Sequence, residues 1–493
     1  MKLIDVFEHV NYKVIQGTLS SNLIEICNDS RLAQEGSLFI AIRGYQLDAH
    51  DFLETVLLQG CRILVIEDLS KVDPKWENIF PDATIIWVES TLKAMAQIAS
   101  EFYGSPSKKF TVIGVTGTNG KTSIAQLTGN CLEALSQDTA VLGTTGNRIG
   151  DQFYPTSNTT VESIKLQWLF QEMSIYPIDT CVMEVSSHAL RTHRVDETSF
   201  DYSIFTNLTE DHLDFHSDME DYYQAKRELF LKTEKCAIIN QDDAYGAKLI
   251  NELKSLGKTV VSYGLTSEAD YQAIDIISHH DGSEFTLKYP KGEIYVMIPI
   301  PGKIYVYNVL AVLSVLDLMG CDASELSTAI KAIRPVEGRL EVIPNKIGAT
   351  VVVDYAHTPD ALDKVLEVCR EFTMGRLYVV FGCGGDRDKM KRPLMGQIAV
   401  KKADSVILTS DNPRTEDPLL ILEDILAGIS ELEKANVVVE VDRRTAIVQG
   451  INQIKKGDTL LIAGKGHETY QVIGKVKTHF DDREEAALAL EKL

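Results

Sequence analysis

Short apolar runs separated by longer helical patterns constrain the fold of this chain more than any other feature of its sequence. The runs are rich in Val and Ile and are continuously apolar instead of alternating with polar residues. Such runs are typical of parallel strands that helices cover on both faces. Examples are residues 62–66, 84–88, 112–115, 181–184, 203–206, 351–354, 377–381, 406–409 and 460–463. The pattern predicts an α/β protein.

Two loop-forming segments divide the chain. One is Gly104-Ser-Pro-Ser-Lys-Lys109 and the other is Arg334-Pro-Val-Glu-Gly-Arg339. A length of 493 residues is that of roughly three domains of about 150 residues each. We therefore predict a smaller α/β domain over residues 1–105, a central domain with a P-loop-type, mostly parallel sheet over 106–334, and a Rossmann-like domain over 335–493.

The composition excludes several classes of protein. The chain has 71 acidic against 49 basic side chains, a formal charge of −22, which disfavours binding to nucleic acid or to anionic membranes. No apolar run approaches the ~18 residues of a transmembrane helix, and acids in the first eight residues lead us to expect no signal peptide. The eight scattered cysteines form no Cys-x-x-Cys pair and are predicted to be buried, reduced thiols. We expect a cytoplasmic protein.

A glycine-rich loop follows the apolar strand at 110–115. It reads Thr116-Gly117-Thr118-Asn119-Gly120-Lys121-Thr122, and a helical pattern begins at Ser123. In such a loop the backbone N–H groups, the helix N-terminus and the lysine face a phosphate chain, while the last hydroxyl can bind Mg²⁺. Val115 stands where the Walker pattern has glycine, so an ordinary glycine-rich turn is the alternative. We predict that ATP or a related nucleotide binds here.

Seven motifs extend over nearly the whole chain and identify a family resemblance. They are the phosphate loop, Met183–His188, Thr206–Leu208 with Asp211–Asp214, Asp354–Pro359, Phe381–Lys389, Asp411–Arg414 and Gly464–Glu468. Together they resemble the Mur ligases, which use ATP and Mg²⁺ to join an amine to a carboxylate through an acyl phosphate.

The last motifs resemble those of the Mur ligases that add the third peptide residue. The resemblance implies that the chain adds meso-2,6-diaminopimelate to UDP-N-acetylmuramoyl-L-alanyl-D-glutamate during peptidoglycan precursor synthesis. It also implies that the first domain binds the UDP-sugar, the central domain ATP and the last domain the amino acid. We expect a monomer whose partners are these small molecules, without nucleic acid or membrane insertion.

Three residues beyond the phosphate loop are candidates for catalysis and metal binding. Glu184 ends one strand and His212 follows another, at the strand ends where open α/β sheets build their sites. Lys226 lies four residues after Tyr222 on a helix expected at 221–230, beside an apolar stripe. The alternatives are a solvated acid, a turn-capping histidine and a lysine whose amine reaches water. The resemblance implies that Thr122, Glu184, His212 and a CO₂-derived carbamate on Lys226 support Mg²⁺, with Lys121, Lys226 and His212 as catalytic residues.

Other segments resemble substrate contacts of the family. Asp29-Ser30-Arg31 and residues 44–52 resemble the uridine-binding segments, and Ser30 is the residue that we carry over. The resemblance assigns the muramoyl-dipeptide to Thr159, Thr160, Ser186 and Arg194, although Thr192 stands where the family often has Gln. Helix capping is the alternative role for these hydroxyls. For ATP it assigns Asn308 and His357, with Asp354 and residues 240–243 nearby, but Ile304 and Tyr305 replace the usual Phe-Asn.

The predicted amino-acid pocket distinguishes between amine substrates. The resemblance assigns it Arg387, Asp411, Asn412, Pro413, Arg414, Gly464 and Glu468. Diaminopimelate ends its side chain in an amine and a carboxylate, so it requires an acid and an arginine together. Lysine lacks that carboxylate and would leave the guanidinium unpaired, a discrimination on the order of 10²-fold. A surface Asp-Asn-Pro-Arg turn is the alternative.

Three other functions stay open. The same ligase could use L-lysine or lanthionine. A folylpolyglutamate synthetase-like ligase is disfavoured by the first domain and by the Asp-Asn-Pro-Arg motif. A nucleotide-switched regulator would hydrolyse ATP or GTP without ligation, but the chain lacks the Asn-Lys-x-Asp motif of a GTPase.

Overall fold

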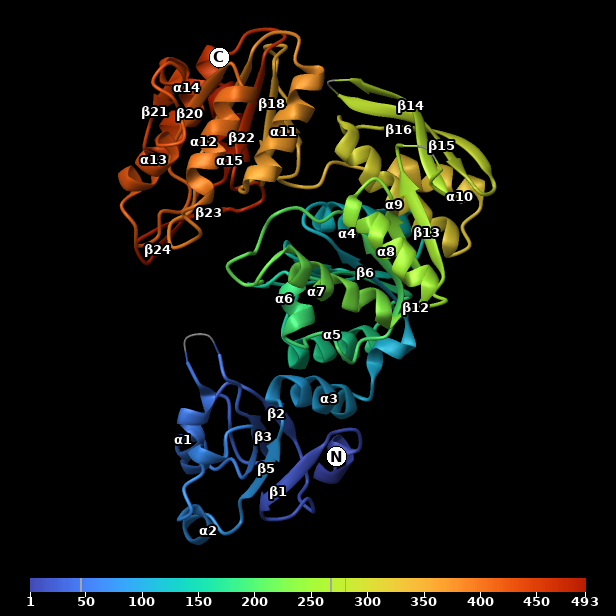
Figure 1. Cartoon of the computed structure of the whole chain (residues 1–493), viewed down its shortest axis with the longest axis vertical. Coiled ribbons are helices and arrows are strands. Elements are labelled where there is room, and N and C mark those ends of the chain that lie inside the picture. The colour runs from blue at the N-terminus through green and yellow to red at the C-terminus, as the bar shows by residue number, and fades with distance from the viewer. Residues whose placement is uncertain (45–46, 267, 280) are drawn as a thin grey trace. The chain divides into compact units, whose positions relative to one another are not determined.

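The computed structural model describes residues 1–44, 47–266, 268–279 and 281–493, and it confirms the α/β prediction (Figure 1). The chain divides into two compact units of interleaved segments. Unit 1 contains residues 1–116, 137–203 and 223–236, and unit 2 contains residues 117–136, 204–222 and 237–493. The division into three domains at 105 and 334 stays a prediction.

A five-stranded sheet in unit 1 has the strand order β1-β5-β4-β3-β2. Its strands are β1 (Tyr12–Gln16), β2 (Glu25–Cys27), β3 (Ser37–Ile40), β4 (Ile63–Ile66) and β5 (Thr84–Val88), and only β1 is antiparallel to its neighbour. Ile63 and Val65 of β4 pack in one core cluster, and Leu64 and Ile66 pack in another. Both faces are therefore buried, which explains the continuous apolar run.

The helices of this region are mostly short. They are η1 (Leu3–Phe7), η2 (Ala49–Phe52), α1 (Leu53–Leu58), η3 (Leu69–Lys71), α2 (Trp76–Ile79) and α3 (Thr91–Tyr103). The hydroxyl of Ser90 caps the start of α3 by accepting from the N–H of Lys93. Residues Pro106–Lys109 of the predicted first linker form a short 3₁₀ helix, η4.

The second sheet has eleven strands in the order β16-β15-β14-β13-β12-β11-β6-β10-β7-β8-β9. Their bounds are β6 (Thr111–Thr116), β7 (Thr139–Gly143), β8 (Gly146–Ile149), β9 (Gln152–Tyr154), β10 (Thr180–Glu184), β11 (Phe200–Phe205), β12 (Thr233–Asn240), β13 (Val260–Gly264), β14 (Tyr271–His279), β15 (Gly282–Tyr289) and β16 (Gly292–Ile298). The pairs β10–β6, β10–β7 and β12–β13 are parallel, as predicted. The strands toward both edges, β7–β8–β9 and β14–β15–β16, pair as antiparallel hairpins, which a pattern of continuous apolar runs does not predict.

Helices follow most strands of this sheet. They are α4 (Lys121–Ala134), α5 (Ser163–Ile175), α6 (Ser187–Arg191), α7 (Met219–Lys232), α8 (Ala244–Ser255), α9 (Lys303–Leu318) and α10 (Ala323–Ala332). Helix α4 begins at Lys121, two residues earlier than the sequence predicts. Lys121 and Thr122 therefore belong to the first turn of a helix, where unpaired N–H groups give the positive end of the dipole.

The third sheet lies in unit 2 and has the order β17-β18-β22-β19-β20-β21. Its strands are β17 (Glu341–Ile343), β18 (Thr350–Asp354), β19 (Leu377–Phe381), β20 (Ser405–Leu408), β21 (Val437–Val439) and β22 (Thr459–Ala463), and all but β17 pair in parallel. Helices α11 (Pro359–Phe372), α12 (Lys391–Lys402), α13 (Pro418–Leu426), η5 (Glu433–Asn436), α14 (Arg443–Gln453) and α15 (Asp482–Leu490) accompany it, with a hairpin of β23 (Tyr470–Ile473) and β24 (Val476–His479) (Figure 1). This is the predicted parallel sheet with accompanying helices.

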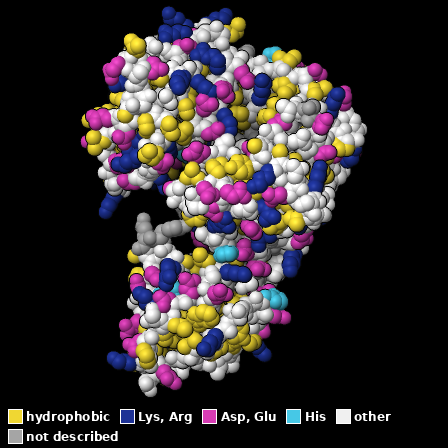
Figure 2. Space-filling view, viewed as in Figure 1, with side chains coloured by type: hydrophobic (Ala, Val, Ile, Leu, Met, Phe, Trp, Pro, Cys, Tyr) yellow, Lys and Arg dark blue, Asp and Glu magenta, His cyan; other side chains and the backbone are white. Residues whose placement is uncertain are grey.

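The surface carries many charged side chains, as expected from the composition. On the face shown in Figure 2, Lys and Arg side chains are interspersed with Asp and Glu. None of the helices in the described ranges is long and apolar enough to span a membrane. All eight cysteines are buried and unbridged, as predicted.

Candidate active site

The carboxyl ends of β6 and β10 lie side by side in unit 1, because Glu184 is in register with Val115. Glu184 is buried, and the N–H of Thr144 donates to its Oε1 at 2.8 Å. Oγ1 of Thr144 lies 3.2 Å from the second carboxylate oxygen and 3.0 Å from Oγ1 of Thr159. A Cβ on Gly143 would lie 2.2 Å from Oε1 of Glu184, so glycine is required there. Glu184 is thus an oriented, buried carboxylate and not the solvated acid of the alternative interpretation.

The phosphate loop in unit 2 is pinned to the residues after β11. The N–H of Thr118 donates to the carbonyl of Asn207 at 2.9 Å, and the N–H of Asn119 donates to Oδ1 of the same residue at 3.0 Å. The hydroxyl of Thr206 donates to the carbonyl of Asn119 at 2.6 Å. Hydrogen bonds from the Thr206-Asn207 motif therefore fix the backbone of the loop.

Two glycines allow this close approach. Gly117 has a φ of 151°, and a Cβ there would lie 1.8 Å from Oγ1 of Thr206. Gly120 has a φ of 90°, and a Cβ there would lie 2.9 Å from Oδ1 of Asn308. The structure thus places the predicted nucleotide residue Asn308 beside the loop.

Arg339 is a residue at this loop that the sequence analysis did not select. Its guanidinium donates to Oγ1 of Thr122 at 3.2 Å and lies over the ring of Tyr355, 4.5 Å from the ring centre. Its Nε is buried and has no hydrogen-bond partner in the described part of the chain. Lys121 in turn donates to the carbonyls of Gly117 and Thr118, both at 2.9 Å. Both cations are therefore held at the loop where phosphate oxygens are expected.

Asp354 supports the backbone next to Arg339. Its carboxylate accepts the N–H of Leu340 at 2.7 Å and the N–H of Ala356 at 2.8 Å. Burial raises the pKa of Asp354, and the positive charge of Arg339 opposes that rise. His357 lies in the same segment, with Nδ1 2.8 Å from the carbonyl of Tyr355.

His212 and Lys226 have contrasting surroundings. His212 follows β11 in unit 2 with a φ of 55°, and its side chain is 43% exposed. Its carbonyl accepts the N–H groups of Phe215 and His216, so the turn predicted as the alternative is present. Lys226, on α7 in unit 1, is 1% exposed. The lysine is therefore buried, which does not agree with the alternative of an amine in water.

The donors assigned to Mg²⁺ have the chemistry that this ion requires. Glu184 offers carboxylate oxygens and Thr122 a hydroxyl, and hard oxygen ligands suit Mg²⁺. No cluster of three or more His, Cys, Asp or Glu side chains suited to a metal occurs among residues 1–44, 47–266, 268–279 and 281–493.

The residues predicted to bind the dipeptide converge in unit 1. The hydroxyl of Thr160 donates to the carbonyl of Glu184 at 2.9 Å and accepts the N–H of Ser186 at 3.1 Å. Arg194 donates to the carbonyl of Thr160 at 2.8 Å and forms an ion pair with Glu162 at 2.8 Å. Ser186 caps α6 through the N–H of Ala189, so the capping interpretation also holds for this residue.

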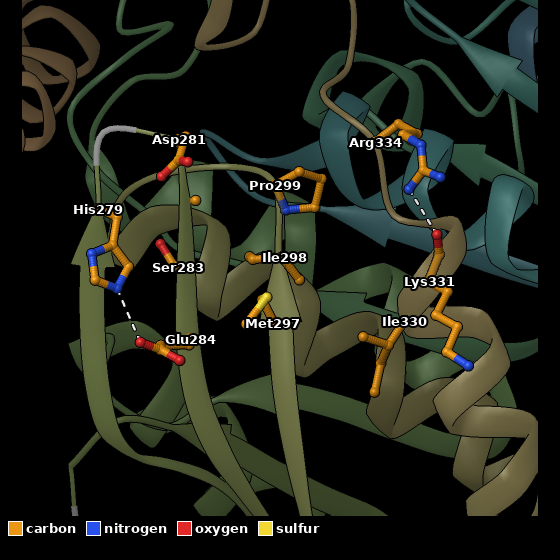
Figure 3. Close-up of a pocket in the computed structure, with 11 residues that line it drawn as sticks. His279, Asp281, Ser283, Glu284, Met297, Ile298, Pro299, Ile330, Lys331 and Arg334 are labelled. Carbon is orange, nitrogen blue, oxygen red and sulfur yellow. Dashed lines mark hydrogen bonds and ion pairs between the residues drawn. The ribbon is translucent and has the colours of Figure 1, made fainter.

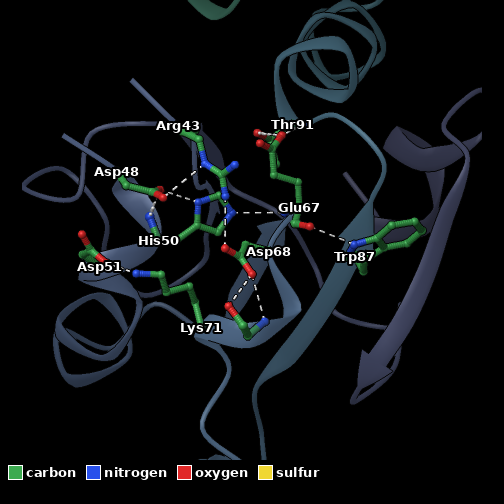
Figure 4. A network of polar contacts seen from close by, with 10 residues as sticks. Arg43, Asp48, His50, Asp51, Glu67, Asp68, Lys71, Trp87 and Thr91 are labelled. Carbon is green, nitrogen blue, oxygen red and sulfur yellow. Dashed lines mark hydrogen bonds and ion pairs between the residues drawn. The ribbon is translucent and has the colours of Figure 1, made fainter. Parts of the chain in front are cut away.

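A buried histidine organises the other predicted UDP-sugar segment (Figure 4). Nδ1 of His50 lies 2.6 Å from Oδ1 of Asp48, and Nε2 accepts the N–H of Glu67 at 3.1 Å. Arg43 bridges Asp48 at 3.4 Å and Asp68 at 3.1 Å. These contacts hold the ends of the segment; its Tyr45 and Gln46 lie outside the described residues. Ser30 lies in the loop after β2, beside the ion pair of Asp29 and Arg31.

The predicted amino-acid residues meet in unit 2. Nδ2 of Asn412 donates to Oε2 of Glu468 at 2.9 Å, and Lys465 donates to Oδ1 of Asn412 at the same distance. Nζ of Lys465 also lies 3.3 Å from Asp411. A Cβ on Gly464 would lie 3.0 Å from Oδ2 of Asp411. The loops after β20 and β22 thus form one site.

The pKa values of the two acids of this site shift in opposite directions. Burial raises the pKa of Glu468, and the nearby carboxylate of Asp411 adds to the rise. Burial also acts to raise the pKa of Asp411, but Lys465 and then Arg443 outweigh it and hold that pKa below its usual range. Asp411 is therefore an ionised partner of buried cations, whereas Glu468 lies farther from Lys465, at 3.9 Å, and accepts from Asn412.

The two arginine loops of the pocket are joined directly. Arg414 has a φ of 49°, and its guanidinium donates to the carbonyl of Gly385 at 2.7 Å. The N–H of Gly385 donates to the carbonyl of Asn412 at 2.9 Å, and a Cβ on Gly385 would lie 1.9 Å from the carbonyl oxygen of Pro413. Arg387 belongs to the same loop as Gly385, and its side chain is exposed.

Two fully buried arginines behind the pocket were missed by the sequence analysis. Arg392 contacts both carboxylate oxygens of Glu416, at 3.0 and 2.9 Å, and donates to the carbonyl of Gly384 at 3.2 Å. Arg443 forms two 2.7 Å bonds to Asp482. Arginine is almost never fully buried unless it is paired with an acid. The burial of these two arginines could therefore be predicted from the sequence only if their acidic partners were already known.

A pocket of about 460 Å³ elsewhere in unit 2 contains none of the predicted site residues (Figure 3). Residues 279 and 281–284 and residues 297–299 line it, together with the end of α10 and Arg334. Nε2 of His279 pairs with Glu284 at 3.0 Å within it.

Comparisons with known proteins cover nearly the whole chain. Three family models match: "Mur ligase family, catalytic domain" at residues 24–103, "Mur ligase middle domain" at 115–316, and "Mur ligase, glutamate ligase domain" at 338–466. A protein of Clostridioides difficile (strain 630), UDP-N-acetylmuramoyl-L-alanyl-D-glutamate--2,6-diaminopimelate ligase, is 44% identical over 493 residues, 100% of each chain. A ligase of Clostridium acetobutylicum with the same activity in its name is 43% identical over 98% of each chain. A solved structure of such a ligase has a TM-score of 0.71 and 32% identity, and the match covers 100% of this chain and 99% of the other.

Proposed function

The chain belongs to the Mur ligase family, and on this premise we propose that it adds meso-2,6-diaminopimelate to UDP-N-acetylmuramoyl-L-alanyl-D-glutamate. ATP is converted to ADP and phosphate as the amide forms. The observation that carries the choice of amine is the meeting of Arg414, Asn412 and Glu468 in one site. An acid and an arginine held together match a side chain that ends in an ammonium and a carboxylate.

The phosphate loop binds ATP in this proposal. The N–H groups of residues 117–122 and the first turn of α4 surround the phosphates, with Lys121 supplying a full positive charge. Asn308 and His357 contact the nucleotide. Arg339 joins this set because its guanidinium already lies at the hydroxyl of Thr122.

Thr122, Glu184, His212 and Lys226 are the residues that would hold Mg²⁺, which when bound neutralises the charge of the transferring phosphoryl group. We propose that Lys226 carries a carbamate. Burial favours the neutral form of an amine, which is the form that adds to CO₂ with release of one proton, and the resulting anion would be balanced by Mg²⁺. The burial of Lys226 supports this step.

The reaction has two steps. The glutamate γ-carboxylate attacks the γ-phosphorus of ATP, which gives an acyl phosphate and ADP. The free amine of diaminopimelate then attacks the acyl carbon, and phosphate leaves from the tetrahedral intermediate as the nitrogen loses its proton. Ser30, Thr159, Thr160, Ser186 and Arg194 position the UDP-sugar dipeptide, and the amino-acid pocket positions the amine, so most of the catalysis is orientation and exclusion of water.

These substrates are small and soluble, so we propose that the protein acts in the cytoplasm. We propose further that it acts as a monomer. The sequence-based domains 1–105, 106–334 and 335–493 would then bind the UDP-sugar, ATP and the amino acid, respectively. Sedimentation at micromolar concentration tests the monomer.

Phosphate release with ATP, Mg²⁺ and the UDP-muramoyl-dipeptide tests the function. We expect release with meso-diaminopimelate and not with L-lysine, together with a product whose mass is that of the tripeptide. Release with lysine alone would keep the ligase and overturn the assignment of the pocket. Release without any amine would support a nucleotide switch, and ligation of a folate substrate would support the folylpolyglutamate type.

Carbamylation of Lys226 has a separate test. The intact protein and its peptides are analysed by mass spectrometry after chemical trapping in bicarbonate, with Lys226→Arg as the control. We expect the trapped group on Lys226 alone. An unmodified amine under these conditions would contradict the proposal.

A further inference from the structure

Tyr305 stands where the family resemblance leads us to expect asparagine, and the proposed function leaves it without a role. It lies in the first turn of α9, three residues after Gly302, whose φ is 94°. Its side chain is buried, and its hydroxyl donates to the carbonyl of Arg339 at 2.7 Å. An asparagine side chain is shorter by most of a ring and would not span this distance.

The bond of Tyr305 is made to a backbone that is fixed on its other sides. The N–H of Arg339 donates to the carbonyl of Val336 at 2.9 Å, and the next N–H donates to Asp354. A Cβ on Gly338 would lie 2.0 Å from the backbone nitrogen of His467, so the segment also packs closely against the loop after β22. The carbonyl of Arg339 completes this set of anchors through Tyr305.

The side chain of Arg339 has one contact of direct interest. Its guanidinium donates to Oγ1 of Thr122, the last residue of the phosphate loop. Its Nε–H is buried and has no hydrogen-bond acceptor among the described residues. A buried, unpaired guanidinium donor beside a phosphate loop is suited to a phosphate oxygen. Burial, and then the carboxylate of Asp354, raise the pKa of Tyr305, and a hydrogen bond with the Ser123 side chain opposes the rise, so the hydroxyl keeps its proton as a donor near neutral pH.

We propose that Tyr305 is a positioning residue that acts through Arg339. By holding the carbonyl of Arg339, it places the guanidinium at Thr122 and at the phosphates of bound ATP. The inference rests on the proposed use of ATP, but it does not depend on which amine is ligated. It assigns to this chain a hydroxyl that replaces the family's usual amide at the start of α9.

A double-mutant cycle tests the proposal. The variants are Tyr305→Phe, which removes only the hydroxyl, Arg339→Gln, and the two combined. Tyr271→Phe is the matched control, because the buried hydroxyl of Tyr271 donates at 2.7 Å to Asp317 near the other end of α9. The measurements are the dissociation constant of β,γ-methylene ATP, kcat/KM for ATP, KM for diaminopimelate, and thermal stability.

Loss of one hydrogen bond leads us to expect about 3- to 10-fold weaker binding of the analogue by Tyr305→Phe, with KM for diaminopimelate unchanged. In the Arg339→Gln background the same substitution should have less than about 2-fold effect, because the side chain that it positions is gone. Equal effects of Tyr305→Phe in both backgrounds, or a change no larger than that of Tyr271→Phe, would overturn the proposal. Binding of the analogue measures the effect of Tyr305 even if no amine supports turnover. Absence of turnover would count only against the proposed function.

Discussion

The phosphate loop and the amino-acid pocket are built in different ways. The loop is one continuous segment, residues 116–122, held by backbone and hydroxyl hydrogen bonds and by glycines without room for a side chain. The pocket joins loops from three parts of the chain, and buried ion pairs such as Lys465–Asp411 and Arg392–Glu416 hold them. The loop should therefore be sensitive to steric change, and the pocket to loss of charge.

The largest expected effect is steric and falls on the loop. Gly117→Ala places a Cβ 1.8 Å from Oγ1 of Thr206 at a φ that alanine disfavours. Because displacement of a positioning group by ~1 Å can lower rates 10²-fold, we expect kcat/KM for ATP to fall by more than about 100-fold. Steady-state kinetics measure this. Gly257→Ala is the control, with positive φ but nothing within 4 Å of the new Cβ; an equal loss in both variants would show that backbone strain alone is responsible.

The next effect falls on the pocket and should leave ATP untouched. Arg414→Ala removes the guanidinium proposed for the distal carboxylate. Loss of a charge-assisted hydrogen bond leads us to expect KM for diaminopimelate to rise roughly 30-fold, with KM for ATP within about 2-fold. Arg444→Ala, which removes an arginine of similar charge that is 62% exposed, is the control. An equal rise in both KM values would break the separation between the two regions.

The pH dependence of stability tests how much the buried ion pairs behind the amino-acid pocket contribute. Arg392 lowers the pKa of Glu416 from 4.5 to about 2. A depressed carboxyl pKa stabilises the fold fully above its unfolded value, and this contribution disappears as the pH falls from about 4.5 toward about 2. As the pH falls through this range, the free energy of unfolding, measured with urea, should decrease less for Glu416→Gln than for the wild type. Glu423→Gln on α13 is the control; parallel wild-type and Glu416→Gln curves would contradict the prediction.

The smallest expected effect concerns an exposed arm of the same ion-pair network. Lys389 pairs with Glu416 at 3.0 Å, but its side chain is 64% exposed. Exposed pairs contribute about 0–1 kcal/mol, so Lys389→Ala should change the free energy of unfolding by less than about 0.5 kcal/mol and KM for diaminopimelate by less than about 2-fold. Urea unfolding and amine titration measure both. A larger loss would mean that exposed charges also shape the pocket.

The difference between the two regions explains how far sequence reasoning could reach. The phosphate loop is encoded by consecutive residues, so its position between β6 and α4 could be predicted, with an error of two residues in the helix start. The pocket residues from Asp411 to Glu468 came from family resemblance and not from spacing. Their buried partners Arg392 and Arg443 gave no local signal, because a lone cation in a sequence is most often exposed, and Lys465 lay within a motif without being assigned a role.

Arg339 shows the same limit over a longer separation. It lies 217 residues from Thr122 in the chain, and no periodicity or motif spacing relates the two. The antiparallel strands β8, β9 and β14–β16 were missed for a different reason. Strands such as β14 and β16 bury one face and expose the other along part of their length, so their residues are not continuously apolar.

The sequence by itself determined the α/β class, the buried parallel strands, the phosphate loop and the family, because each depends on consecutive residues or on ordered motifs. Only the tertiary structure decided which cation faces which acid, that Lys226 and Glu184 are buried, and that Tyr305 contacts Arg339. Hydrogen bonds and ion pairs act over a few ångströms in space and carry no record of separation along the chain. Their partners are therefore set by how the strands and helices pack.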